Sequence, residues 1–480
     1  MIKYKEELKH YEFVILGDGS GGTLAKKLAQ FGFKTALIGL GRPGGTCLNR
    51  GCIPSKKLIA PIFKLYSAIQ TVQKYDSDFE MKVKDRISFT KLKKEVLKEI
   101  TADSLSSKNN MEEGNIKNLT YYASHTKFID DSTLQLENGT KLTFDKIVIA
   151  TGSEPRIPKE IKGIENIEYD TSTEALFSQE EISSYTIVGG GVISCELGAL
   201  YAACGIKVTI IATGTILRVI DDIIKKDVEK YLQELGITII KKVSIENIEE
   251  RNGNIVLNYS KEKLTQTHIT PRLLVALGVE PNTKYLGLKN TSIDVNSKGF
   301  ICTDENYKVN ENIFAIGDCS GKSMLRHGAG FEAREVFKQI IYNNSNTLSQ
   351  AYMPYGIYLG SSEIGGCGKT SQQLIKEKIE FKTYSKKFEE TVYGKAKGLK
   401  GIVLVHYNPQ SLEIYGAHTF GPDGVNLNQI IVPYIEKNQT LYDLADTISP
   451  HPSLAEGLFT IGVREIVYDT IHKTFKNKKQ

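Results

Sequence analysis

The chain has 480 residues, of which 40% are hydrophobic and 24% are charged, and its formal net charge is +5. This composition is ordinary for a globular protein and leaves room for about two to four domains. The small net charge gives no reason to expect nucleic acid or membrane binding, and no run of about 18 apolar residues is present. Because the first residues also lack the apolar core of a signal peptide, a cytoplasmic location is expected.

The first predicted unit is a strand, a glycine-rich turn and a helix. Phe13-Val-Ile-Leu predicts a buried strand, Gly17-Asp-Gly-Ser-Gly-Gly22 follows at once, and a helix over 23–31 and a strand over 34–40 come next. In this context a G-x-G-x-x-G turn lets the backbone approach a pyrophosphate, which lies on the helix N-terminus. The segment therefore predicts a dinucleotide-binding fold.

The acidic residue that usually holds a ribose at the end of the second strand is missing. Gly39 stands at that position. We therefore expect the adenosine ribose to be held in another way, through backbone groups or Arg42.

A cysteine-containing stretch follows, from Arg42 to Lys57. Cys47 and Cys52 are five positions apart, which on a regular helix separates the Cα atoms by about 8.6 Å, beyond the limit of about 7 Å for a disulfide. A bridge between them needs a bent backbone, which Gly51 could allow. By itself the spacing also fits two buried thiols, whereas an intracellular bridge here would be catalytic rather than structural.

The other cysteines show no metal-ligand spacing, so no metal site is predicted and buried free thiols are expected. These cysteines are Cys195, Cys204, Cys302, Cys319 and Cys367.

Two helices and a set of short strands complete the first third of the chain. The helices are predicted over 58–69 and 87–111, and the strands over 119–128, 133–136, 141–144 and 146–150, with Asn138-Gly139 as a hairpin turn. The last of these strands runs into Thr151-Gly152-Ser153, a common pattern that by itself proves little.

A second copy of the opening pattern begins at Tyr185. A strand over 186–188 leads into Gly189-Gly-Gly-Val-Ile-Ser194, then a helix reaches Cys204 and a strand covers 207–211. Two such folds in one chain imply two nucleotides brought together.

The second copy departs from the motif in two places. Ser194 replaces the third glycine, which we expect to loosen the helix packing slightly. Ala212 stands where an acidic residue would favour NAD, and only Arg218 is available for a 2′-phosphate. The sequence therefore leaves the choice between NADH and NADPH open.

The last part of the chain has no glycine fingerprint. A strand over 312–316 ends in Gly317-Asp318, where the aspartate suggests a ligand crevice or, equally simply, a helix N-cap. Beyond residue 351, β-rich segments alternate with amphipathic helices; the segments are 392–393, 401–407 and 413–419, and the helices 425–436 and 441–447. His451, with Glu456 five residues later, could form an oriented base, although a surface histidine is the simpler interpretation.

Four motifs occur in the order seen in one family. Gly44-Gly-Thr-Cys-Leu-Asn-Arg-Gly-Cys-Ile-Pro-Ser-Lys56 is the most specific, followed by Ala150-Thr-Gly-Ser, Ala315-Ile-Gly-Asp and His451-Pro-Ser-Leu-Ala-Glu. With them, nearly the whole chain resembles the flavoprotein disulfide reductases, which include dihydrolipoamide dehydrogenase and glutathione, mycothione and mercuric reductases.

The resemblance implies an α/β fold with two Rossmann-like dinucleotide-binding domains and a C-terminal α+β dimerisation domain. The implied parts are an FAD-binding domain with the redox disulfide at 1–155, an NAD(P)-binding domain at 156–282, a central domain completing the FAD site at 283–350, and a dimerisation domain at 351–480. A homodimer follows from that last domain.

The resemblance also implies roles for individual residues. Cys47 would attack the disulfide substrate, and Cys52 would face the flavin as the charge-transfer thiolate. His451, oriented by Glu456, would act as acid and base in the active site of the partner subunit.

Two cofactors are implied, FAD and either NAD or NADP. Gly17, Gly19 and Gly22 would hold the FAD pyrophosphate, and Gly189 and Gly191 the nicotinamide nucleotide. Lys56 would lie near the flavin and pair with Glu196. The full implied cofactor set is Gly17, Gly19, Ser20, Gly22, Gly45, Thr46, Lys56, Thr151, Gly152, Gly189, Gly191, Ile193, Glu196, Gly278, Asp318 and Leu325.

A lipoyl-type dithiol is the leading substrate, as in dihydrolipoamide dehydrogenase. Val192 stands where glutathione reductases usually carry a tyrosine and is similar to some dihydrolipoamide dehydrogenases, whereas Ala212 is more like the NADPH users. The alternative is therefore an NADPH-dependent reductase of a small disulfide, of glutathione or mycothione type, or a relative of mercuric reductase, although no N-terminal metal-binding module or C-terminal cysteine pair is present. Arg50, between the cysteines, suggests a charge that stabilises a thiolate or attracts an anionic substrate, or equally a solvated surface arginine.

Two other classes are disfavoured. A non-catalytic flavin-binding protein would not need Cys47, Cys52 and His451 together. A related NADH oxidase normally relies on a single redox cysteine.

Overall fold

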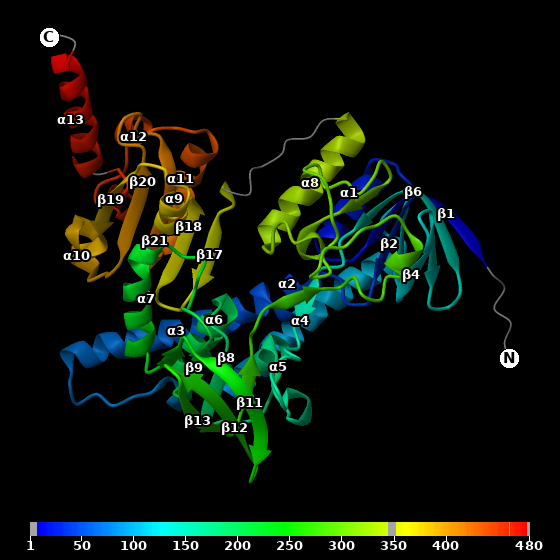
Figure 1. The fold of residues 1–480 in the computed structure, drawn as a ribbon, viewed down its shortest axis with the longest axis horizontal. Coiled ribbons are helices and arrows are strands. Elements are labelled where there is room, and N and C mark those ends of the chain that lie inside the picture. The colour runs from blue at the N-terminus through cyan, green and yellow to red at the C-terminus, as the bar shows by residue number, and fades with distance from the viewer. Residues whose placement is uncertain (1–6, 344–351, 460, 478–480) are drawn as a thin grey trace.

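The computed structural model describes residues 7–343, 352–459 and 461–477, and Figure 1 shows how they are arranged. Within these residues, no helix has both the length and the apolarity needed to cross a bilayer.

The N-terminal unit is built on a seven-stranded sheet in the order β3-β2-β1-β6-β5-β4, with β16 also paired to β6. Val14 to Leu16 are at most 1% exposed, as expected for a parallel strand covered on both faces. The strands are β1 (Leu8–Leu16), β2 (Thr35–Gly39), β3 (Leu119–Ala123), β4 (Thr126–Asp130), β5 (Thr133–Leu136), β6 (Lys141–Ile149) and β16 (Ile313–Ala315).

Helices cover one face of this sheet. α1 (Ser20–Gln30) packs on α8 (Arg326–Tyr342), and both cover the side chains of Phe13 and Ile15. The chain then continues through α2 (Gly45–Arg50), α3 (Cys52–Tyr75) and α4 (Phe89–Glu112). In Figure 1, α3 leads away from this sheet and runs beneath the C-terminal unit.

The second unit repeats the parallel pattern with four strands in the order β10-β9-β8-β14. The strands are β8 (Ser184–Val188), β9 (Lys207–Ala212), β10 (Thr238–Lys241) and β14 (Leu273–Val275), and the helices are α5 (Ser172–Phe177), α6 (Val192–Ala203) and α7 (Asp222–Glu234). β7 (Ser153–Pro155) and β15 (Val279–Pro281) pair with each other where the chain enters and leaves this unit.

The C-terminal unit has a five-stranded antiparallel sheet in the order β17-β18-β21-β20-β19, with helices packed around it. Its strands are β17 (Tyr355–Tyr358), β18 (Glu363–Gly368), β19 (Lys382–Lys387), β20 (Ile402–Tyr407) and β21 (Ile414–Gly421). Its helices are α9 (Ser371–Lys376), α10 (Val392–Lys397), α11 (Gly424–Glu436), α12 (Leu441–Ala445) and α13 (Ile461–Asn477). The predicted α/β class, with two dinucleotide folds and an α+β unit, is confirmed.

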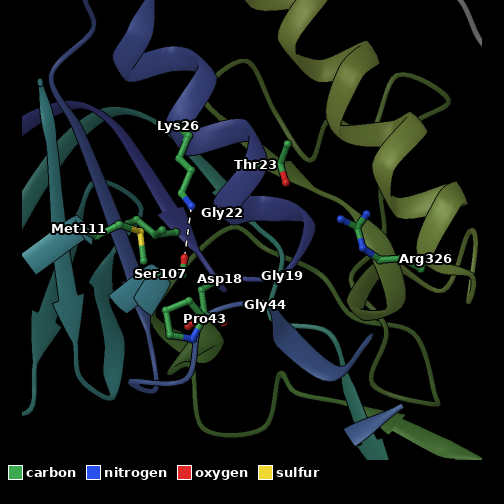
Figure 2. A pocket seen from close by; sticks show the side chains of 11 residues that line it. Asp18, Gly19, Gly22, Thr23, Lys26, Pro43, Gly44, Ser107, Met111 and Arg326 are labelled. Carbon is green, nitrogen blue, oxygen red and sulfur yellow. Dashed lines mark hydrogen bonds between the residues drawn. The ribbon is translucent and has the colours of Figure 1, made fainter. Parts of the chain in front are cut away.

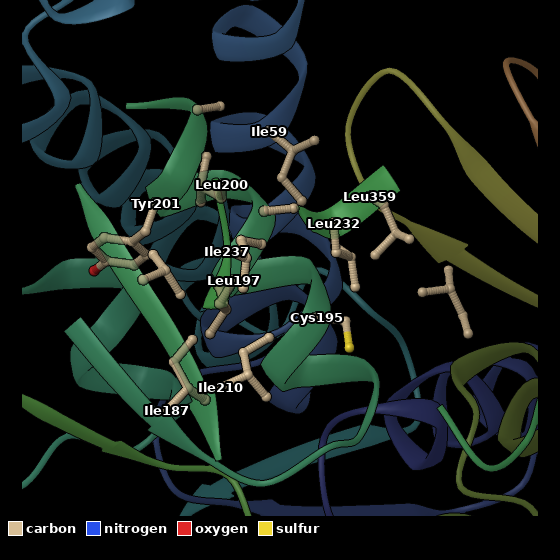
Figure 3. Packing of buried hydrophobic residues seen from close by; sticks show 14 of the residues in the cluster. Ile59, Ile187, Cys195, Leu197, Leu200, Tyr201, Ile210, Leu232, Ile237 and Leu359 are labelled. Atoms are coloured by element: carbon tan, nitrogen blue, oxygen red, sulfur yellow. The ribbon is translucent and has the colours of Figure 1, made fainter. Parts of the chain in front are cut away.

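One apolar core joins all three units. Figure 3 shows Ile59 of α3 and Leu359, beyond β17, close to the buried side chains of α6 and α7. Ile59 is 5% exposed and Leu359 is fully buried. Each buried side chain of this size stabilises the fold by about 1.5–3 kcal/mol, so this core fixes α3 against the other two units.

Three predictions about secondary structure are wrong. Residues 119–128 form two strands, β3 and β4, which lie at opposite ends of the sheet. Residues 392–393 begin α10, because the Thr391 side chain accepts a hydrogen bond from Gly394 N and caps a helix there. Residues 141–144 and 146–150 belong largely to one strand, β6.

A three-stranded antiparallel sheet is missing from the prediction. It consists of β11 (Ser244–Arg251), β12 (Asn254–Lys261) and β13 (Leu264–Thr270). β13 is polar and largely exposed, so it lacks the apolar alternation by which a strand is predicted.

Candidate active site

The first glycine turn opens onto a cavity of about 140 Å³. α1 starts immediately after Gly19 without a side-chain cap, so its first N–H groups are available to an anion. Figure 2 shows Asp18 and Lys26 on one side of this cavity and Arg326, from α8, on the other. Gly22 lines the cavity, and Gly17, at the end of β1, has φ +103°.

Arg326 is a residue that the sequence analysis does not single out. Its Nη1 donates a hydrogen bond of 3.0 Å to Ser20 Oγ, the first residue of α1. The guanidinium therefore lies at the same helix N-terminus as the glycine turn, where phosphate charge is favoured. No local signal could reveal it, because the two residues are 306 positions apart.

A second set of predicted residues gathers beside β6. Asp318 accepts a hydrogen bond of 2.5 Å from Ser153 Oγ, and burial raises the pKa of Asp318. The buried hydroxyl of Thr151 has no hydrogen-bond partner among the described residues. Gly152 has φ +71°.

The donors and acceptors of these two sets fit a dinucleotide such as FAD. The uncapped start of α1 and Arg326 suit its phosphates. The unpartnered Thr151 hydroxyl and the Asp318 carboxyl suit other polar groups of the cofactor. Arg42, which with backbone groups is one of the expected ribose partners, donates to Thr101 Oγ1 at 3.4 Å. Leu325 directly precedes α8, and the carbonyl of Gly278 accepts from Arg156 N.

Cys47 and Cys52 lie on either side of a break between two helices. Cys47 is in α2, Cys52 is the first residue of α3, and Gly51 separates the helices with φ −141° and ψ −110°. The buried Asn49 side chain donates to the carbonyls of Arg42, Pro43 and Gly45 and holds the α2 turn in place.

The two cysteines are free thiols that share a hydrogen bond. That hydrogen bond lowers the pKa of the Cys52 thiol to about 6; burial opposes the shift, and the Lys56 ammonium supports it. The same hydrogen bond and burial raise the pKa of Cys47. Within this pair the negative charge is therefore favoured on Cys52, and the start of α3 favours the same charge.

Two cations have the main effect on the pKa values of the thiols. Lys56 lowers the pKa of both thiols, and Arg326 lowers that of Cys47. Arg50 is half-exposed in the last turn of α2 and is not one of the main influences on either thiol.

The expected pair of Lys56 and Glu196 is present. Lys56 Nζ lies 2.6 Å from Glu196 Oε2, and the other carboxylate oxygen accepts from Tyr358 N at 2.9 Å. The ammonium also lies 4.9 Å from the centre of the Tyr358 ring. These three residues come from α3, α6 and β17, so one buried carboxylate connects three parts of the chain beside the thiols.

The second glycine turn precedes α6. Gly189 has φ +133° and Gly191 is the uncapped residue before the helix. Ser194, expected to loosen the packing, is fully buried, and its hydroxyl has no partner among the described residues. Ile193, at the start of α6, is 38% exposed.

His451 and Glu456 form the predicted pair on the surface of the C-terminal unit. His451 Nδ1 lies 2.7 Å from Glu456 Oε1, and this hydrogen bond lowers the pKa of Glu456. The His451 side chain is 65% exposed. In the described parts of the chain, no hydrogen bond or ion pair links it to Cys47 or Cys52.

A buried cluster of Asp221, His406 and His418 connects α7 to β20 and β21. Although burial opposes it, hydrogen bonds from His406 and Ser371 hold the pKa of Asp221 well below its usual value. Both Asp221 oxygens already accept hydrogen bonds. The cluster therefore connects the second unit to the C-terminal unit by buried hydrogen bonds.

Four of the five remaining cysteines are buried free thiols, as expected. Cys302 is the exception, because it is exposed.

The chain matches two family descriptions. Residues 11–333 match the pyridine nucleotide-disulphide oxidoreductases, and residues 353–460 match the dimerisation domain of the same family.

Relatives of known activity cover nearly the whole chain. It is 31% identical over 460 residues to a dihydrolipoyl dehydrogenase of Geobacillus stearothermophilus, covering 93% of this chain and 94% of that one. It is 26% identical over 455 residues to a mercuric reductase of Staphylococcus aureus, covering 93% of this chain and 81% of that one. A solved structure, the HOCl-induced flavoprotein disulfide reductase RclA from Escherichia coli, superposes with a TM-score of 0.81 at 23% identity, covering 93% and 98% of the two chains.

Proposed function

The chain belongs to the pyridine nucleotide-disulphide oxidoreductase family, and from that premise we propose that Cys47 and Cys52 exchange electrons with a dithiol or disulfide substrate, as in dihydrolipoyl dehydrogenase. The family binds FAD and NAD(P)H. The observation that carries the proposal is the thiol pair at the break between α2 and α3, with the pKa of Cys52 lowered to about 6.

The residues around the thiols divide the chemistry between them. Cys52 holds the negative charge at neutral pH, supported by Lys56. Cys47 keeps its proton, because its hydrogen bond to Cys52 raises its pKa. A base must therefore take the Cys47 proton before its sulfur can attack a disulfide.

The exchange balances as a two-electron step. The Cys47 thiolate attacks one sulfur of the substrate disulfide and releases the first substrate thiolate. Cys52 then attacks Cys47 in the mixed disulfide, which releases the second substrate thiolate and leaves a Cys47–Cys52 disulfide. FAD, when bound, would pass two electrons from NAD(P)H to this disulfide and so restore the dithiol.

His451 suits the role of the base. Its imidazole is exposed, and Glu456 fixes Nδ1, which leaves Nε2 free to take or give a proton. Because its own chain's thiols are not its partners, we assign this role to His451 of the partner subunit in a homodimer. The match of residues 353–460 to a dimerisation domain supports this assignment.

The test is a thiol count on the purified protein under anaerobic conditions. One equivalent of NAD(P)H should bleach the visible absorbance of the bound flavin transiently and make two additional thiols reactive. In Cys47→Ser and Cys52→Ser the nucleotide should still bleach the flavin, but no additional thiol pair should appear and lipoamide turnover should fall by at least about 10³-fold, as for loss of a nucleophile. Wild-type turnover in both variants would contradict the proposal.

An NADPH-dependent disulfide reductase is the second candidate, and one observation favours it. No carboxylate stands at the end of β9, where Ala212 is buried. A Cβ on Gly214 would lie 2.1 Å from Arg218 Nη2, so the guanidinium lies over the turn that follows β9. No ion pair between Arg218 and a carboxylate occurs in the described residues. A free arginine at this turn suits a 2′-phosphate.

Steady-state kinetics with both nucleotides test this candidate. NADPH should be the better reductant, and Arg218→Ala should raise its KM about tenfold or more, as for a charged hydrogen bond worth at least about 1.5 kcal/mol. The KM for NADH should stay within about twofold. Arg251→Ala, which removes an exposed arginine of β11, is the matched control.

A further inference from the structure

The space beyond Gly39 is taken by another residue of the chain. Gly39 is the buried last residue of β2. A Cβ built on it would lie 2.1 Å from Asp18 Oδ2 and 2.7 Å from Asp18 Cγ. Real Cβ contacts of that length do not occur, so no residue with a side chain fits at position 39 while the Asp18 carboxyl is in place.

Asp18 belongs to the glycine turn, between Gly17 and Gly19. Its carboxyl and its backbone carbonyl each accept one hydrogen bond. The Tyr121 hydroxyl donates a hydrogen bond of 3.1 Å to Asp18 Oδ2, and the carbonyl of Asp18 accepts from Gly44 N at 3.0 Å. Tyr121 lies on β3, directly opposite Leu37 of β2, so the neighbouring strand holds the carboxyl over the end of β2.

Asp18 is also one of the residues at the cavity that lies at the start of α1. Asp18 lines this cavity with Gly22, Lys26 and Ser107. Lys26 donates to Ser107 rather than to Asp18, and in the described residues no lysine or arginine pairs with Asp18. Among the side chains of the described residues, Tyr121 donates to Oδ2 and none donates to Oδ1, so Oδ1 is available to a ligand.

An acid at the end of the second strand of such a fold usually accepts hydrogen bonds from ribose hydroxyls. In this chain the strand ends in glycine, but a carboxyl still occupies the adjoining space from a different point of the backbone. We infer that Asp18 is the ribose-binding acid of the first dinucleotide site, and that Gly39 is required because it makes room for it. The inference rests on FAD occupying this site.

The test compares flavin binding by full-length variants, independently of turnover. FAD is removed from the purified protein, and its dissociation constant is measured from the quenching of flavin fluorescence when FAD is added back. Asp18→Asn keeps an oxygen for Tyr121 but removes the charge, and should weaken FAD binding by about tenfold or more. Asp145→Asn, an exposed carboxylate of β6 that is 63% exposed, is the matched control and should change nothing.

A ribose-specific probe separates this role from a general loss of structure. ADP and 2′,3′-dideoxy-ADP are compared as competitors that displace FAD. The wild-type protein should prefer ADP by about tenfold or more, and Asp18→Asn should lose most of this preference.

A swap between the two positions is the sharpest form of the test. Gly39→Glu should lose FAD, because the new Cβ collides with Asp18. The double variant Asp18→Gly/Gly39→Glu should recover both FAD binding and the preference for ADP, because the acid returns to the strand end.

Each result decides between two causes. If FAD binding and the preference for ADP are unchanged in Asp18→Asn, the inference is overturned, while FAD remains the cofactor. If the double variant binds FAD no more tightly than Gly39→Glu, the exchange of positions is overturned. A wild-type protein that takes up no FAD would overturn the cofactor of the first site, and Asp18 with it.

Discussion

The two glycine turns of this chain look alike in sequence but leave different room for an acid. In the first, Gly39 ends β2 and the side chain of Asp18 fills the space beside it. In the second, Ala212 ends β9, and a Cβ on Gly190, the counterpart of Asp18, would lie 2.9 Å from the Ala212 Cβ and 3.3 Å from Ile216 Cα. The second turn therefore excludes an acid at its middle position and carries none at the strand end.

The difference shows how a binding group can change position in a fold. A carboxyl can reach the same point from the strand end or from the glycine turn, but the other position must then be small. The first site keeps an acid in this way. The second carries none, and the guanidinium of Arg218 lies over the turn that follows its strand.

The largest expected effect comes from removing the first glycine of each turn. In Gly17→Ala the new Cβ would lie 2.1 Å from the Ala150 carbonyl oxygen, and in Gly189→Ala 2.3 Å from that of Ala276. Positive φ values add about 1–3 kcal/mol of strain to each clash. Gly17→Ala should lose FAD and unfold at a lower temperature, whereas Gly189→Ala should keep FAD and raise the nucleotide KM.

Flavin absorbance, thermal unfolding and steady-state kinetics measure these effects. Gly253→Ala is the control, because this residue has φ +71° but no atom within 4 Å of the new Cβ. Equal loss of flavin in the Gly17 and Gly189 variants would mean that the two turns do not serve separate ligands.

The next effect comes from giving the second site the acid that it lacks. Ala212→Asp places a carboxylate at the end of β9, where it can accept hydrogen bonds from the 2′-hydroxyl of NADH and repel the 2′-phosphate of NADPH. The ratio of kcat/KM for NADH to that for NADPH should rise about tenfold or more. An unchanged ratio, with FAD still bound, would contradict the role given to this strand end.

A smaller effect is the pH dependence of FAD binding, which we expect at the first site because of Asp18. Burial raises the pKa of Asp18, although the Tyr121 hydroxyl opposes the shift. As the pH falls through this raised value, the carboxylate is protonated and a ribose loses its charged acceptor. FAD should bind more weakly at low pH in the wild-type protein, with a flatter profile in Asp18→Asn. A titration of FAD affinity against pH measures this, and coinciding profiles would contradict it.

The smallest effect concerns the protein without flavin. Because the folded-state pKa of Asp18 lies above its usual value of 3.8, the folded chain disfavours the charged form, and this cost is present at pH values above the raised pKa and disappears below about 3.8. Flavin-free Asp18→Asn should therefore unfold at the same or a slightly higher temperature than the wild type at pH 7. A clearly lower unfolding temperature would mean that Asp18 serves the fold more than the ligand.

Local patterns in the sequence determined much of this protein. The two strand, glycine-turn and helix units, the spacing of Cys47 and Cys52 and the pair of His451 and Glu456 each lie within a short segment, and short segments are governed by backbone sterics and apolar periodicity. The fold class could be predicted from them. The polar strands β11 and β13 could not, because they carry little apolar alternation.

Only the tertiary structure decided what meets at the sites. The order of strands in the first sheet brings Tyr121 beside Asp18. Helix α8 brings Arg326 to the start of α1. Strand β17 donates a backbone hydrogen bond to Glu196, the partner of Lys56. From sequence alone, Gly39 indicated a missing acid. The acid is supplied from 21 positions earlier in the chain, because parallel strands and their connecting turns converge at one edge of a sheet, whatever their separation along the backbone.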